Sequence, residues 1–140
     1  MSLYLDASVL VTLFVIDPLS ARAEAFLLAQ PEIVVVSDFG VAEFSSVVGR
    51  RARTHDLTRE DGQLAFSNLD TWVARSAYRQ EITTADVDAA NRILRRLDVN
   101  LRTPDAIHIA IAQRLEATLV TFDRSMAAGA RALGIAVATP

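Results

Sequence analysis

The chain of 140 residues contains no cysteine and no lysine, and it has no long hydrophobic run. Without cysteine, neither disulfide bonds nor zinc–thiolate sites can form. The longest apolar run, Val9–Ile16, spans eight residues and is interrupted by Thr12, whereas a membrane-spanning helix needs about 20 apolar residues. Asp6 and the lack of an early basic residue argue against a signal peptide. We therefore expect a cytoplasmic protein that does not associate with a membrane.

The composition favours one globular domain covering residues 1–140. Apolar residues make up 51% of the chain and charged residues 22%. A domain of this length buries roughly two-thirds of the surface that its unfolded chain exposes. The sequence contains no internal repeat, low-complexity segment or linker. A sizeable hydrophobic core in a single domain is therefore expected.

Strands and helices are predicted to alternate along the chain. Short apolar or β-branched runs predict strands at Leu3–Leu5, Ile33–Val36, Tyr78–Ile82, Thr118–Phe122 and Ile135–Ala138. Helical spacing predicts helices at Ala7–Ile16, Ser20–Gln30, Leu57–Val73, Asp105–Leu115 and Ser125–Leu133. Two more are predicted, one from Ser37 or Asp38 to about Arg51, and one after Thr83 or Thr84 with an apolar stripe from Val87 to Leu97. This alternation favours an α/β fold of three layers, α/β/α, with a central parallel sheet of about four to five strands.

Local signals predict several helix boundaries. Side chains that can cap a helix N-terminus precede three of the helices: Ser37 or Asp38, Thr83 or Thr84, and Thr103. Pro104 suits the first helical position after Thr103, and Gly134 is expected to end the last helix. The polar stretch Arg50–Asp56 is predicted to be a loop.

Three aspartates stand where a predicted strand passes into a helix or in the first turn of a helix. Asp6 and Asp123 directly follow apolar strands, and Asp105 lies in the first turn of a helix. The strands of a parallel α/β sheet end at one edge, where ligands bind in such folds. We therefore expect the three carboxylates to gather at that edge.

Glu43 is predicted to join them from the helix that follows the second strand. It shares a helix face with Phe39 and Val47, which lie four residues before and after it. A carboxylate on a face that its neighbours tend to bury needs a partner.

Each carboxylate also has an ordinary explanation. Asp6 and Asp123 can cap helices, and Asp105 can interact with a helix dipole. Glu43 can pair with an arginine. As a group, however, two such charges ~5 Å apart repel by ~3 kcal/mol at an effective dielectric constant of ~20. A cluster of this kind either protonates or recruits a cation, and hard oxygen ligands select Mg²⁺ or Mn²⁺. The pattern therefore predicts a metal site suited to phosphate chemistry.

The net charge of the rest of the chain differs in sign from that of the whole chain when the four clustered carboxylates are left out of the count. The net charge of −3 usually argues against a nucleic acid partner. Without the four clustered carboxylates, 13 acidic residues face 14 basic ones, which leaves +1. All 14 basic residues are arginine. Biased codon usage accounts for this, and bidentate binding of phosphates is the functional alternative.

The four acidic residues lie in four short segments: Leu5–Ser8, Val41–Phe44, Leu101–His108 and Leu119–Arg124. Together these segments resemble the signature of the PIN domain family, and more narrowly that of the VapC toxins of bacterial toxin–antitoxin pairs. No single segment is specific, but their order and spacing in a chain of this length are. The resemblance covers the whole chain.

This resemblance implies a PIN-like fold and an Mg²⁺- or Mn²⁺-dependent endoribonuclease in which metal-activated water hydrolyses RNA phosphodiester bonds. It implies that the acidic quartet is the catalytic centre. Asp6, Asp105 and Asp123 would be metal ligands, and Glu43 would bind the metal directly or through water.

The resemblance extends to supporting residues and partners. Ser8 and Thr121 are similar to the family's supporting hydroxyls. Candidate contacts to RNA are Arg102 and Arg124, which flank two of the carboxylates, and Arg50. The implied partners are an RNA substrate, a second copy of the chain, and a small cognate antitoxin whose tail fills the active-site groove.

Other polar residues have competing interpretations. His108, three residues after Asp105, is expected to be a core histidine, with contact to the metal ligands as the alternative. His55 is expected to be solvated in a loop. Asp86 is expected to cap its helix, and an outer role near the metal is the alternative.

Three other functions remain to be weighed. A metal-free nuclease could use His55 and His108 as acid and base. A receiver-like phospho-acceptor also clusters aspartates, but similar domains need a lysine that this chain lacks. A catalytically silent PIN-fold module could bind other proteins.

Overall fold

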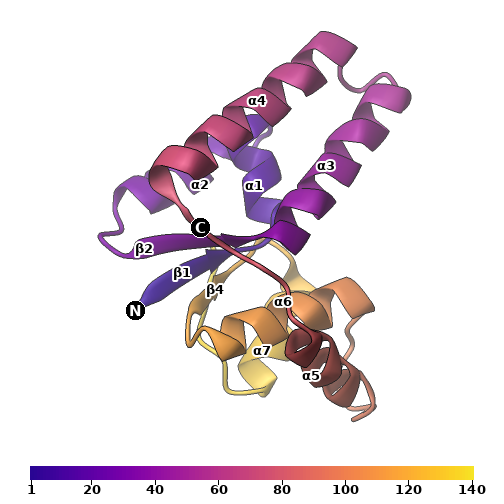
Figure 1. Ribbon diagram of the computed structural model, residues 1–140. Coiled ribbons are helices and arrows are strands. Elements are labelled where there is room, and N and C mark those ends of the chain that lie inside the picture. Colours follow the sequence, from indigo (N-terminus) through magenta and orange to yellow (C-terminus); the bar gives the residue numbers. More distant parts are fainter.

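The computed structural model describes residues 1–140 and contains five strands and seven helices (Figure 1). Each of the first three strands is followed by two helices, and the fourth strand is followed by one. The strands are β1 (Ser2–Leu5), β2 (Ile33–Ser37), β3 (Tyr78–Gln80), β4 (Thr118–Val120) and β5 (Val137–Ala138). The helices are α1 (Ala7–Phe14), α2 (Ser20–Leu28), α3 (Asp38–Arg53), α4 (Arg59–Ser76), α5 (Thr84–Leu94), α6 (Thr103–Arg114) and α7 (Arg124–Ala132). None of the helices is both long and apolar enough to cross a membrane.

The strands form one parallel sheet in the order β3-β2-β1-β4-β5, as predicted. The central strand β1 pairs with β2 on one side, with Tyr4 opposite Val35, and with β4 on the other, with Tyr4 opposite Leu119. Since all five strands run in the same direction, their carboxyl ends lie along one edge of the sheet.

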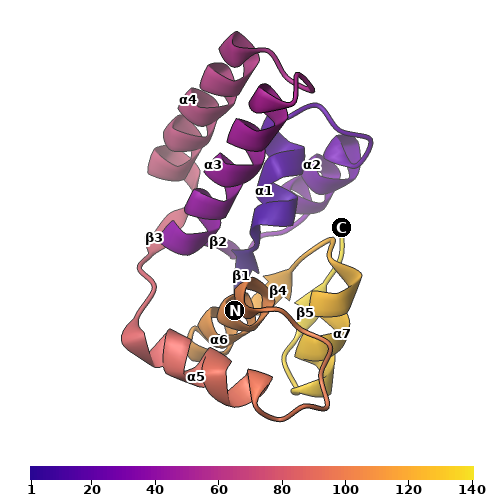
Figure 2. The ribbon, with the colours of Figure 1, turned by 90° about the vertical axis from the view of Figure 1, so that its right-hand side faces the viewer.

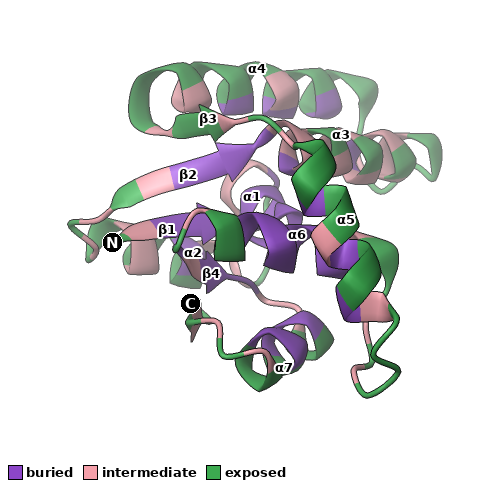
Figure 3. Ribbon diagram, turned by 60° about the horizontal axis from the view of Figure 1, so that its bottom comes forward, coloured by how far each residue is buried: buried purple, intermediate pink, exposed green.

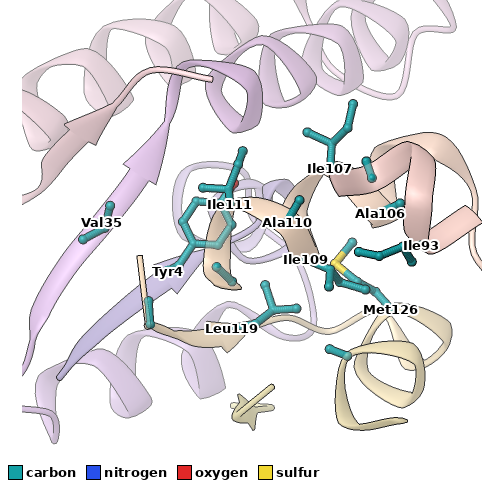
Figure 4. Close-up of a cluster of buried hydrophobic side chains, with 14 residues drawn as sticks. Tyr4, Val35, Ile93, Ala106, Ile107, Ile109, Ala110, Ile111, Leu119 and Met126 are labelled. Atoms are coloured by element: carbon teal, nitrogen blue, oxygen red, sulfur yellow. The ribbon is translucent and has the colours of Figure 1, made fainter. Parts of the chain in front are cut away.

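Successive residues of β1, β2 and β4 alternate between two different hydrophobic clusters. Tyr4, Val35 and Leu119 pack with residues of α5, α6 and α7 (Figure 4). Their neighbours Leu5 and Val36 pack with residues of α1, α2, α3 and α4. Because successive side chains of a strand point to opposite faces, the sheet is covered on both sides. Figures 1 and 2 show the first four helices on one side and the last three on the other, which confirms the three-layer prediction.

The helix α6 is the most enclosed of the seven (Figure 3). Eight of its residues are buried, from Asp105 to Ala112 without interruption. The sequence predicts this, because the helix is apolar almost all round. It carries both a site carboxylate and His108 in the core.

Several helix boundaries differ from the predictions. The helix α1 ends at Phe14, because Val15 is extended and the next residue, Ile16, is fully exposed. The prediction that Thr103 caps α6 is wrong: Thr103 is the first helical residue and Arg102 is the N-cap. The carboxylate of Asp105 accepts a hydrogen bond from the backbone amide of Arg102 at 2.9 Å, and no hydroxyl caps the helix.

The region between α3 and α4 is also more helical than predicted. The helix α3 continues to Arg53, within the expected loop, and α4 begins at Arg59 after Thr58, which caps it. Ser37 caps α3 and Thr83 caps α5, as one of each predicted pair of candidates. Gly134 follows α7 with a positive φ of 77°, as expected of a helix end.

Candidate functional site

Asp6 is the most buried carboxylate of the predicted quartet. It follows β1 directly, is 1% exposed, and caps α1 by accepting a hydrogen bond from the amide of Val9 at 3.1 Å. Its Oδ1 also accepts from Ser8 Oγ at 2.6 Å, and its Oδ2 accepts from Thr121 Oγ1 at 2.6 Å. Burial raises the pKa of Asp6 above its ordinary value, although these hydrogen bonds oppose the shift.

The two predicted supporting hydroxyls join the ends of β1 and β4. Thr121 Oγ1 accepts a hydrogen bond from the amide of Asp123 at 2.9 Å, and Ser8 Oγ accepts one from the amide of Phe122 at 3.0 Å. Each hydroxyl donates its hydrogen to Asp6. The orientation of Asp6 is therefore coupled to the loop that carries Asp123.

Asp105 and Asp123 both lie at helix N-termini. Asp123 caps α7, with its Oδ1 accepting from the amide of Met126 at 2.8 Å. Asp105 is 4% exposed, and its Oδ2 accepts from the amide of Arg102. One oxygen of each carboxylate has a protein partner, and the other oxygen forms no hydrogen bond within the protein.

Glu43 projects from α3 and meets α6 rather than an arginine. Its Oε1 forms a hydrogen bond with Nε2 of His108, and its side chain is 29% exposed. His108 is 1% exposed, as the main prediction of a core histidine expects. It also contacts a site carboxylate, as the alternative expects. Its Nδ1 lies 2.7 Å from the hydroxyl of Tyr4, which lies 2.8 Å from Ser37 Oγ.

Sequence reasoning missed Tyr4 and Ser37 as part of this group. Ser37 was assigned only as a candidate helix cap, and Tyr4 only as part of an apolar strand. The available signal was the phenol itself, since a buried Tyr hydroxyl needs a hydrogen-bond partner. Burial, opposed by the Ser37 hydrogen bond, raises the pKa of Tyr4 well above its ordinary value, so the phenol stays protonated.

One cavity of about 540 Å³ brings the predicted quartet together. It is lined by the four carboxylate residues, by His108 and Ser8, and by three arginines: Arg50, Arg51 and Arg102. The arginines come from the last turns of α3 and the N-cap of α6, so positive charge stands beside the acidic residues. Arg124 does not line this cavity but a second, smaller one of about 330 Å³.

The donor set fits a hard divalent cation in its chemistry. All four side chains offer oxygen, and Glu43, Asp105 and Asp123 each keep one oxygen without a protein hydrogen bond. As the side chains stand, however, no three of them lie close enough together to hold a metal ion. The four carboxylates line a shared cavity without converging into a closed cage.

Asp86 and His55 both lie away from the cavity. Asp86 forms a capping box with Thr83 and an ion pair with Arg114, and it does not line the cavity. This is the predicted capping role. His55 is exposed between α3 and α4 and does not line the cavity either, whereas His108 is buried. The two histidines do not form an acid–base pair.

A family model and a relative of known sequence both match nearly the whole chain. Residues 3–132 match the family model described as the PIN domain. Ribonuclease VapC46 of Mycobacterium tuberculosis is 32% identical, with 99% of this chain and 98% of that protein covered.

Solved structures share the fold at lower identity. The structure of VapC20, a Sarcin-Ricin loop cleaving toxin from Mycobacterium tuberculosis, has a TM-score of 0.74 at 18% identity, and the match covers 91% of this chain and 94% of that one. The structure of VapBC2 from Rickettsia felis bound to a promoter DNA fragment has a TM-score of 0.73 at 17% identity and covers 99% and 98%. The fold, the family model and the full-length relative agree: this chain belongs to the PIN domain family.

Proposed function

We propose that this chain is an endoribonuclease that hydrolyses RNA phosphodiester bonds with the help of Mg²⁺ or Mn²⁺, and that it is the toxin of a toxin–antitoxin pair. The observation that carries the proposal is the cavity at the carboxyl edge of the sheet. Four carboxylates from four separate segments line it, in a PIN domain protein with a ribonuclease relative along its full length.

The carboxylates of the cavity would bind the cation that phosphodiester hydrolysis needs. Asp6, Asp105 and Asp123 would hold the cation, with Glu43 bound to it directly or through water. The bound cation would supply positive charge for the scissile phosphate and lower the pKa of a water molecule. Asp6 is held in place by its two hydroxyl partners, so its carboxylate needs no reorganisation when substrate arrives.

The arginines beside the carboxylates would bind the RNA backbone. Arg50, Arg51 and Arg102 line the cavity, and guanidinium groups bind phosphate oxygens in pairs. The Arg102 side chain is 81% exposed and only 3.9 Å from Asp105, so it can reach a phosphate held at the acidic cluster. We propose Arg51 as an addition to the sequence-based candidates, and we place Arg124 second to them because it lines another cavity.

The partners and the compartment belong to the same proposal. The substrate is RNA, and the protein forms a homodimer and a complex with a small cognate antitoxin. It acts in the cytoplasm. These statements are supported by the resemblance to VapC toxins that the four acidic segments carry.

The decisive experiment is RNA cleavage by the purified protein in the presence of Mg²⁺ or Mn²⁺, with the cut ends determined by sequencing. Asp6→Asn is expected to abolish cleavage while the protein stays folded, because the amide is uncharged and escapes the desolvation of a buried carboxylate. Asp70→Asn, at an exposed position of α4, is the matched control and should cleave like the wild type. Full activity in excess EDTA would contradict the proposal.

A catalytically silent protein-binding module is the second candidate function. It is favoured by one observation, that no three acidic or histidine side chains are close enough to hold a metal ion as they stand. Isothermal titration with Mn²⁺ separates the two functions. Absence of binding at millimolar metal would favour the silent module.

A further inference from the structure

A row of four polar side chains runs from the core of the protein to the cavity. It consists of Ser37 at the end of β2, Tyr4 in β1, His108 in α6 and Glu43 in α3. Ser37 and Tyr4 are fully buried, and neither lines the cavity. Only Glu43, at the other end of the row, is part exposed. A polar row in a hydrophobic core is stable only if every donor in it finds an acceptor.

The hydrogen bond at the buried end determines the direction of the others. Ser37 Oγ accepts a hydrogen bond from the amide of Gly40 at 2.9 Å, which leaves its own hydrogen for the oxygen of Tyr4. The phenol hydrogen of Tyr4 is then directed to Nδ1 of His108. Since Nδ1 accepts, a neutral imidazole carries its hydrogen on Nε2 and donates it to Oε1 of Glu43. Every hydrogen in this order has an acceptor.

The opposite direction leaves groups unsatisfied. If Nδ1 of His108 donated to Tyr4, the phenol would donate to Ser37, whose hydroxyl hydrogen would then have no acceptor in the core. In a neutral ring, the lone pair of Nε2 would also face the carboxylate of Glu43, so two acceptors would meet. An unmade hydrogen bond in a buried place is costly, and the first direction is therefore favoured.

We infer that Ser37 and Tyr4 are positioning residues: they hold His108 as the Nε2–H tautomer, so that it presents a permanent hydrogen-bond donor to Glu43 Oε1 and leaves Oε2 for the chemistry of the cavity. The expected effect of this row on RNA cleavage rests on the proposed function, whereas the tautomer of His108 follows from the hydrogen bonds alone. The role is similar to that of the outer partners of metal-ligating groups, which fix orientation without contacting substrate.

The glycine in the first turn of α3, Gly40, lies beside the Ser37 end of this row. A Cβ atom on Gly40 would lie 3.3 Å from Ser37 Oγ and 3.6 Å from Cε1 of His108. A side chain here would crowd Ser37 Oγ but would make only an ordinary contact with the imidazole, so the lack of one matters at the Ser37 end of the row.

The first test is the position of the ring hydrogen in the metal-free wild-type protein at neutral pH, measured by ¹⁵N NMR of the imidazole nitrogens. The chain has only 2 histidines, so the His55→Gln variant assigns the signals of His108. Hydrogen on Nε2 alone is expected. Hydrogen on Nδ1, or on both nitrogens, would overturn the inference whatever the protein does to RNA.

The second test removes only the hydroxyl in the middle of the row. Tyr4→Phe is expected to weaken the preference of His108 for the Nε2–H form and to lower kcat for RNA cleavage about tenfold with little change in KM, because Tyr4 does not touch the cavity. Tyr78→Phe, at a residue 64% exposed in β3, is the matched control and should change neither quantity.

The outcomes of the two tests separate this inference from the proposed function. Wild-type kcat together with an unchanged tautomer in Tyr4→Phe would overturn the inference and leave the nuclease intact. If the wild type cuts no RNA, the proposed function fails and NMR still decides the tautomer. Ser37→Ala, which removes the start of the row, replaces Tyr4→Phe if circular dichroism shows that the latter does not fold.

Discussion

Asp6 is an acidic residue in a buried position, and burial disfavours the charged form of a carboxylate. It is a carboxylate that is 1% exposed, and burial raises its pKa. Its three hydrogen-bond donors, from Ser8, Val9 and Thr121, oppose that shift and orient both oxygens. The folded protein therefore holds a carboxylate in a place where a cation would relieve the cost of its charge.

Arg50 and Arg102, which line the cavity, are expected to contact phosphates of the RNA backbone. Arg50→Gln and Arg102→Gln should each raise KM for RNA several-fold with a smaller effect on kcat, because each removes a phosphate contact. Each should also reduce the slope of log affinity against log salt concentration by about one. Arg75→Gln, at an exposed site on α4 that does not line the cavity, is the control. Unchanged affinity and salt slope in both cavity variants would show that these arginines do not bind RNA.

At the scale of the elements, Asp86 joins α5 to the neighbouring helix α6. Asp86 accepts two hydrogen bonds from Arg114 of α6, at 2.7 Å and 2.9 Å, and one from the amide of Thr83 at 2.8 Å. Burial raises the pKa of Asp86, but the hydrogen bonds from Arg114 and Thr83 outweigh it and hold the pKa below the ordinary value of 3.8. The ionised form thus favours the folded state.

Loss of this carboxylate should destabilise the protein in a pH-dependent way. Asp86→Ala is expected to lower the free energy of unfolding at pH 7 by about 2 kcal/mol, because it removes both a helix cap and a paired charge. Since the folded-state pKa is depressed, this stabilisation is present above the unfolded-state pKa and is lost as pH falls through the folded-state pKa. The difference from the wild type in urea unfolding should therefore shrink below about pH 4.

The control for this prediction lies on the same helix. Asp88→Ala replaces an exposed aspartate of α5 and should change stability by less than about 0.5 kcal/mol. An equal loss in both variants would mean that the effect belongs to helix charge in general and not to the pairing of Asp86 with Arg114.

On the scale of the whole molecule, the sheet places a local excess of negative charge at one edge of a chain whose net charge is only −3. Asp6 and Asp123 stand at strand–helix junctions, Glu43 comes from α3 and Asp105 from the start of α6, and the parallel arrangement brings all four to one cavity. Removing a charge imbalance at this edge should stabilise the entire fold. A cation that binds only the folded protein stabilises it by mass action.

Metal binding is therefore expected to appear as thermal stabilisation. At a Mn²⁺ concentration of 100 times Kd, the gain is about 2.7 kcal/mol, which corresponds to a rise in Tm of about 8 °C for a domain of this size. Asp6→Asn should show little of this rise, and Asp70→Asn should show all of it. A Tm that does not change at millimolar Mn²⁺ would support the catalytically silent module.

The sequence by itself determined the alternation of strands and helices, the parallel sheet and the edge at which Asp6 and Asp123 stand. These features follow from local causes: apolar runs define buried strands, and capping residues such as Thr83 define where helices begin. Helix boundaries were less certain where two local signals compete. At α6, Thr103 is the first helical residue and Arg102 the N-cap, whose backbone amide donates to the carboxylate of Asp105.

Only the tertiary structure decided which side chains meet across elements. Glu43 pairs with His108, 65 positions away, and His108 reaches Tyr4 across 104 positions. Arg50 lines the cavity of the carboxylates while Arg124, adjacent in sequence to one of them, lines another. These contacts depend on how far each helix is rotated and shifted on the sheet. Packing of the whole core sets that placement, and no local pattern in the sequence encodes it.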